Sequence, residues 1–290
     1  MRTKNHQDAL KMFRVCLFSL FAVMLTLSIC SQANADAADM DWDPGMETTL
    51  SHPAVKQETK ITTKLGLGIG VIPDYEGSND YTAVPIPFAR IDSNTGQYIG
   101  LLGTTIRANV LTSKMWSLGP VLRYRAERDD VEDKQVDDLR KVDAALEVGA
   151  FAGIKIDQWT AMIEAAQDIA DGHEGMLVTL VAGYSMPLDT GLMLSLNAST
   201  TYASDDYMDA YFGIDKNNAA RSGLDVFEAD SGIKDCGIRA GLDYVLNKNW
   251  SFIGALGYKR LVGDAKNSPV VDDEGNANQY LGGIVAVYNF

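Results

Sequence analysis

The last segment of the chain, residues 279–290, most constrains the fold. Apolar and aromatic side chains such as Tyr280 and Ile284 alternate with polar ones such as Gln279, and the chain ends with Tyr288 and Phe290 on the apolar face. A strand of this kind turns one face to lipid and the other to a polar interior. We therefore expect a strand that closes a barrel in a bacterial outer membrane. We also expect Tyr288 and Phe290 to be recognised by the barrel-assembly machinery.

The first 35 residues read as a secretory signal. Four basic residues precede an apolar stretch at 15–30, and Ala33-Asn34-Ala35 is a small-x-small cleavage site. An uncleaved anchor is one alternative, but a spanning helix needs about 20 apolar residues. A lipoprotein signal ending at Cys30 is another, although the preceding isoleucine fits poorly. We expect cleavage after Ala35.

The charge of the chain limits the class of binding partner, and its cysteine content limits the possible disulfides. The formal net charge is −14, and loss of the basic signal would make the mature chain more acidic. Nucleic acid is therefore excluded as a main partner, since phosphate binding needs clustered Lys and Arg. After cleavage, Cys236 is the one cysteine left, so no internal disulfide can form, and its alternation with Ile238 and Ala240 predicts a lipid-facing residue.

Two regions follow the signal. Residues 36–60 are polar and acidic and predict a flexible periplasmic leader. From residue 61 to 290, alternating segments are separated by turn signals, which is typical of an all-β fold, a transmembrane antiparallel up-and-down β-barrel of about twelve strands. The expected strands are 62–72, 83–92, 95–102, 104–111, 115–127, 142–155, 158–168, 174–186, 190–203, 233–246, 249–262 and 279–290.

The lengths of the connections orient this barrel. Long loops belong outside and short turns in the periplasm. The loops near 73–82, 128–141, 169–173, 204–232 and 263–278 all fall outside if the chain turns at Gly103, whereas one continuous strand over 97–111 would invert every later loop. A soluble sandwich would also alternate, but the signal and the terminal aromatic residue favour the membrane. Three tryptophans at strand ends, Trp116, Trp159 and Trp250, fit an interfacial girdle.

The residues expected to face the lumen carry both signs of charge. They are Lys64, Arg107, Arg123, Arg125, Glu147, Lys155, Glu164, Asp235, Arg239, Asp243 and Lys259. We expect ion pairs to thread the lumen, since a selective pore would more naturally be lined by one sign of charge. A small channel stays open as an alternative.

No credible catalytic set emerges. His52 and His173 are the histidines left after cleavage; the first lies in the leader, and the second in a tight loop where we expect it to be solvated. The acidic loop 204–232 lacks the spaced ligands of a calcium loop, so we expect a solvated surface that recruits cations bridging lipopolysaccharide. We expect no cofactor, no specific metal site and no enzymatic activity.

Several outer-loop motifs occur together. They include Pro73-Asp74-Tyr75-Glu76-Gly77-Ser78, Tyr211-Phe212-Gly213-Ile214, Ser222-Gly223-Leu224, Gly263-Asp264-Ala265 and Ser268-Pro269-Val270. In this order, with this C-terminus, they resemble the MipA/OmpV family of outer-membrane proteins from about Lys64 to Phe290. The matched positions, which we expect to be structural, are Pro73, Tyr75, Gly77, Ser78, Tyr211, Phe212, Gly223, Gly263, Asp264, Ser268 and Pro269.

The resemblance implies a non-catalytic scaffold that links a periplasmic murein hydrolase, a lytic transglycosylase, to a murein synthase. It also implies a second possibility, a surface-exposed antigen or adhesin, which the long acidic loops would suit. Scaffold, channel and adhesin are therefore the hypotheses that the sequence leaves.

Overall fold

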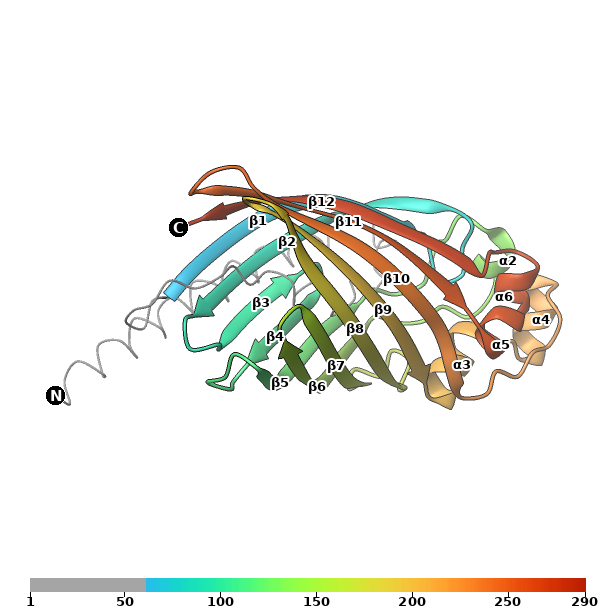
Figure 1. Cartoon of the computed structure of the whole chain (residues 1–290). Coiled ribbons are helices and arrows are strands. Elements are labelled where there is room, and N and C mark those ends of the chain that lie inside the picture. Colours follow the sequence, from blue (N-terminus) through green and yellow to red (C-terminus); the bar gives the residue numbers. More distant parts are fainter. Residues whose placement is uncertain (1–60) are drawn as a thin grey trace. The chain divides into compact units, whose positions relative to one another are not determined.

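The computed structural model describes residues 61–290. The predicted signal peptide (1–35), the predicted leader (36–60) and His52 lie outside the described residues. Strands β1 to β12 form a closed antiparallel barrel in which each strand pairs with its neighbours in sequence and β1 pairs with β12 (Figure 1). The predicted fold class is thus confirmed.

The strand bounds follow the alternation seen in the sequence, with ends shifted by a few residues. They are β1 Ile61–Pro73, β2 Tyr81–Ser93, β3 Tyr98–Leu102, β4 Thr105–Asn109, β5 Trp116–Arg125, β6 Ala145–Ile156, β7 Trp159–Asp168, β8 Met176–Asp189, β9 Leu192–Ala203, β10 Gly232–Val245, β11 Trp250–Leu261 and β12 Asn278–Asn289.

Short helices lie in the connections at one end of the barrel, at the right of Figure 1. They are α2 Lys134–Asp137, α3 Asp205–Phe212, α4 Lys216–Ser222, α5 Gly263–Asn267 and α6 Pro269–Asp272. No helix within residues 61–290 is long and apolar enough to cross a membrane.

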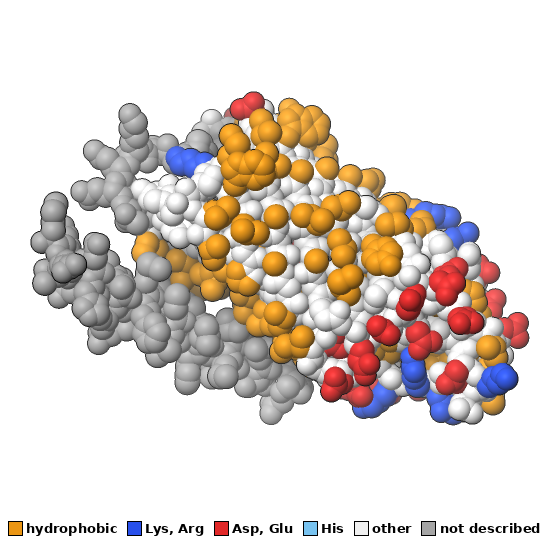
Figure 2. Space-filling view, turned by 90° about the horizontal axis from the view of Figure 1, so that it is seen from below, with side chains coloured by type: hydrophobic (Ala, Val, Ile, Leu, Met, Phe, Trp, Pro, Cys, Tyr) orange, Lys and Arg blue, Asp and Glu red, His pale blue; other side chains and the backbone are white. Residues whose placement is uncertain are grey.

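The barrel wall turns its apolar side chains outward. Leu67 is 66% exposed and Leu256 is 73% exposed, although both lie within strands. Figure 2 shows hydrophobic side chains spread over the wall, and acidic and basic ones gathered at the end that bears the helices. Such a belt is stable against lipid and would be costly in water. Cys236 is exposed in this belt, as predicted.

The tryptophan girdle takes the predicted place. Trp116, Trp159 and Trp250 are exposed at the first residues of β5, β7 and β11. Trp250 packs against Tyr288, their ring centroids 5.1 Å apart, and Tyr288 packs against Phe290. Tyr288 and Phe290 therefore belong to the end of the barrel opposite the helices, which we call the periplasmic end.

The predicted turn at Gly103 is present. Gly103 has φ +58°, which allows the tight turn between β3 and β4, and its N–H donates to Pro87 O on β2 over 3.0 Å. Because β3 and β4 are separate strands, the five long connections all lie at the helix-bearing end, which we call the outer end.

Strand β1 packs closely against β12 at its inward-facing glycines. A Cβ on Gly68 would lie 2.2 Å from Ile284 O, closer than real atoms approach. The glycine leaves room for Val285 from β12, which belongs to a buried cluster with Phe88 from β2. The missing side chain at these positions therefore relieves crowding between the two strands.

Candidate functional site: a cap over the outer end

One buried apolar cluster covers the outer end of the barrel. It draws side chains from the connections 74–80, 126–144, 204–231 and 262–277, which together we call the cap. The third of these connections contributes Tyr207, Met208, Tyr211 and Phe212, all nearly or fully buried on α3. Burying several large side chains in one cluster makes the four connections a single packed unit.

Loop 204–232 exposes its acidic side chains to solvent, as expected, but it buries its apolar ones. Its acidic residues Asp205 and Asp206 stay exposed at the start of α3, while the apolar side of the helix faces the barrel. The sequence did not predict this burial, because the aromatic residues of α3 find their apolar partners in other loops, far away in the sequence.

The family-motif residues of the first loop hold the cap to the strands. Gly77 has φ +105°, and a Cβ there would lie 2.5 Å from Val271 Cγ2 on α6. The Gln279 side chain accepts from Gly77 N (3.2 Å) and donates to Ser78 O (3.0 Å). Pro73 and Tyr75 are buried beside them.

The later motif residues join the third and fourth loops. Ser268 is fully buried; its hydroxyl donates to Phe212 O over 2.7 Å and accepts from Val270 N, at the start of α6 where Pro269 is the first residue. Asp264 accepts from Asp230 N over 3.1 Å.

Two of the motif glycines end or begin helices. Gly223 ends α4 with φ +80°, and Gly263 begins α5 with φ +58°. Gly223 is exposed at the rim of the cap. The structure thus places the outer-loop motif residues in or beside the cap, and Tyr288 and Phe290 at the other end.

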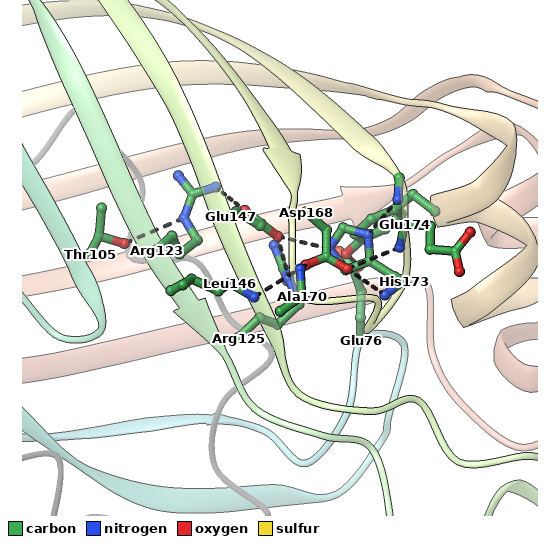
Figure 3. Close-up of polar contacts among 12 residues, drawn as sticks. Glu76, Thr105, Arg123, Arg125, Leu146, Glu147, Asp168, Ala170, His173 and Glu174 are labelled. Atoms are coloured by element: carbon green, nitrogen blue, oxygen red, sulfur yellow. Dashed lines mark hydrogen bonds and ion pairs between the residues drawn. The ribbon is translucent and has the colours of Figure 1, made fainter.

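An ion-pair network lies beneath the cap (Figure 3). Glu147 on β6 pairs with Arg123 (2.7 Å) and Arg125 (2.8 Å), and Glu164 on β7 pairs with Arg107 (2.6 Å) and Arg123. All five side chains are at most 4% exposed. The predicted ion pairs in the lumen are confirmed here, and their burial means that removal of one partner would leave an uncompensated charge.

His173 belongs to this network, so the expectation of a solvated histidine was wrong. Its side chain is fully buried, and Nε2 lies 3.1 Å from Glu147 Oε1. Gly175 N donates to its Nδ1 over 3.0 Å, so the proton sits on Nε2 and is donated to Glu147. Asp168 turns the loop inward by accepting from the backbone of Ala170 and His173. Both ring nitrogens are occupied, which leaves none to act as a base.

A second charged cluster links the first loop to the barrel wall. Glu76 is 3% exposed and accepts from Lys234 (2.5 Å), Lys259 (2.9 Å) and the Tyr207 hydroxyl (2.8 Å). Burial alone would raise the pKa of the Glu76 carboxyl, but Lys234 and Lys259 outweigh burial and hold that pKa below its usual range. Glu76 therefore stays ionised and tied to the wall.

Sequence reasoning missed Glu76 and Lys234. Lys234 faces the lumen beside Asp235 because the register between β9 and β10 shifts between Ile233 and Asp235. A bulge of this kind inserts an extra residue and breaks strict alternation. Glu76 belongs to the first-loop motif, so the motif could have marked it as a functional residue. Nothing in the sequence, however, showed which residues Glu76 would contact.

The packed cap and the ion pairs beneath it can keep the outer end of the barrel closed. The same side chains form no metal centre within residues 61–290. No group of three or more His, Cys, Asp or Glu side chains in that part of the chain converges as ligands.

Comparison with known proteins agrees with this architecture. The family model for "MltA-interacting protein MipA" matches residues 65–290. Outer membrane protein Omp26La of Vibrio anguillarum is 27% identical over 202 residues, which is 69% of this chain and 70% of that protein. MltA-interacting protein of Escherichia coli K12 is 23% identical over 217 residues, 72% of this chain and 83% of that protein.

Among solved structures, the COG4313 outer membrane channel from Pseudomonas putida F1 aligns with 86% of this chain and all of its own, with 12% identity and a TM-score of 0.47. The apolar belt, the girdle and the outer-membrane relative place the protein in the outer membrane. Because the family model matches residues 65–290, which is nearly the whole barrel with its cap, the chain belongs to the MltA-interacting protein MipA family.

Proposed function

We propose that the protein is a non-enzymatic outer-membrane scaffold. It binds a periplasmic murein hydrolase of the lytic transglycosylase class and holds it beside a murein synthase. Membership of the MipA family and the name of the Escherichia coli relative support this assignment.

The observation that carries the proposal is the packed cap. Aromatic side chains of α3 and the loops fill the outer end of the barrel, and buried ion pairs lie directly beneath them. A diffusion channel needs a continuous water-filled path lined by polar groups, which this arrangement opposes. The engagement of both His173 nitrogens likewise favours a binding role over hydrolysis.

The partner surface is then assigned to the periplasmic end. The turns there are short, and a stable interface buries about 800 Å² on each partner. We therefore assign part of the surface to the leader, residues 36–60. Two further partners are proposed: lipopolysaccharide around the acidic cap, and the barrel-assembly machinery at Tyr288 and Phe290.

A binding measurement with purified components tests the proposal. The lytic transglycosylase of the same bacterium is titrated onto the barrel in nanodiscs, with the Escherichia coli relative and its own transglycosylase as the positive control. Saturable binding that weakens when residues 36–60 are deleted supports the scaffold. Absence of binding alongside a working control, together with defined conductance steps in planar bilayers, would favour the channel instead.

A further inference from the structure

The lipid-facing wall has a hollow of about 670 Å³ on the side formed by β5 to β9. Trp116 stands at one end, and Ala198, Ser199 and Thr200 on β9 stand at the other. Nearly all of the surface that lines it is apolar, and the residues that face outward there belong to the belt that meets lipid.

The strand register explains the hollow. One row of outward side chains crosses the sheet through direct cross-strand pairs, in the order Trp116, Ile154, Ala161, Ala182 and Ala198. Three consecutive alanines form a low floor, because paired positions on one face of a sheet are direct neighbours.

Bulky side chains stand in the rows on either side of this floor. One flanking row contains Ile163, Leu180 and Thr200, and the other contains Trp159, Tyr184 and Leu196. Trp159 and Tyr184 also pack on each other, their centroids 4.8 Å apart. The hollow is therefore a groove bounded on one side by Ile163, Leu180 and Thr200, which line it. Its floor row continues past Ala198 to Ile238, which is 64% exposed.

We propose that this groove, between Trp116 and Ala198, binds one acyl chain of a phospholipid from the periplasmic leaflet. Four inter-strand steps of about 4.8 Å make it about 19 Å long. Half of a hydrocarbon core of about 30 Å is about 15 Å, so the groove has the length of a chain in one leaflet.

The position of the groove selects the leaflet. It starts at Trp116, the first residue of β5 at the periplasmic girdle, and ends at Ala198, in the middle of β9. Because barrel strands are tilted, a row across them climbs from the girdle towards the bilayer centre. A chain anchored at the periplasmic interface follows that course.

A second copy of the protein fits the groove less well. An isologous dimer places the same patch on both partners, so this face would set hollow against hollow and leave a void. Voids between apolar surfaces lose dispersion contacts. A flexible acyl chain fills the groove without that loss.

Photo-crosslinking with lipid tests the proposal. The barrel is reconstituted with a phospholipid that carries a diazirine in its acyl chain, and adducts are mapped by mass spectrometry. We expect adducts to concentrate on β7 to β9. Ala182→Phe fills the floor and should lower them by about tenfold, equivalent to about 1.4 kcal/mol. Ala83→Phe, at an exposed lipid-facing site on β2, should leave them unchanged.

Other outcomes overturn the proposal. Adducts spread evenly around the wall would mean that the groove has no preference. A dimer in native mass spectrometry that Ala182→Phe dissociates would assign the face to a second copy. Preferential adducts from a diazirine-labelled lipopolysaccharide would assign it to the other leaflet. Heat-modifiable migration on gels confirms that each variant is folded.

Discussion

The hydroxyl of Tyr207 donates a 2.8 Å hydrogen bond to Glu76, and this contact joins two outer loops that lie 131 positions apart in the sequence. The Tyr207 ring also packs edge-on against His173, with centroids 4.9 Å apart. Tyr207 therefore connects the Glu76 cluster to the arginine and glutamate network, so the cap and the lumen beneath it are expected to respond to mutation as one unit.

Neutralising Glu76 should loosen the cap. Glu76→Gln keeps the shape and an acceptor for Tyr207 but removes one of the two carboxylates that pair with Lys234 and Lys259, leaving Asp235 alone to face both lysines. Breaking a buried ion pair in this way costs about 3 kcal/mol. We expect faster cleavage of the outer loops in limited proteolysis, while Glu228→Gln, at an exposed position of the same cap, should match the wild type. Equally slow cleavage of both variants and the wild type would refute the role of Glu76 in holding the first loop to the barrel wall.

The same carboxylate predicts how the cap responds to acid. An ordinary glutamate has a pKa of about 4.3. Because the pKa of Glu76 is lowered in the folded protein, its contribution to stability is fully present above pH 4.3 and is lost as pH falls through the lower folded value. Loop proteolysis by an acid-active protease at pH 5 should therefore remain as slow as at pH 6, and Glu76→Gln should remove that acid-resistant part of the protection. Full exposure of the loops already at pH 5 would contradict this.

Gly77 should tolerate no side chain. Its φ of +105° is strained for other residues, and a Cβ would meet Val271. We expect Gly77→Ala to destabilise the cap by about 2 kcal/mol, measured as a lower temperature of loop cleavage. Gly232→Ala, where a Cβ meets nothing within 4 Å, is the matched control. Adding Val271→Ala should relieve the clash and leave the backbone strain, so rescue should be partial.

His173 should act as a structural residue. His173→Ala leaves Glu147 without one donor and opens a gap beside Tyr207 and Tyr211. We expect the folded, heat-modifiable band to unfold at a lower temperature by several degrees, consistent with a loss of about 2 kcal/mol. Asp171→Asn in the same loop keeps its backbone preference and should behave as wild type. An unchanged unfolding temperature for His173→Ala would contradict the assigned role.

The barrel could be predicted from sequence because alternation is a local signal. Alternation over about ten residues is enough to predict each strand, and the lengths of the loops predicted the turn at Gly103. The cap could not be predicted, since Tyr75, Tyr211 and Val271 come from separate loops whose meeting depends on barrel closure. Lys234 was missed because a bulge overrides alternation.

Site-specific photo-crosslinking in intact cells tests the scaffold claim most directly. A photoreactive amino acid is placed at Lys248 in a periplasmic turn and, for comparison, at exposed Asp225 in the cap. We predict an adduct with the lytic transglycosylase, identified by mass spectrometry, from position 248 and none from position 225. Absence of that adduct from periplasmic turns, in cells that contain both proteins, would contradict the assignment of the periplasmic end as the partner surface.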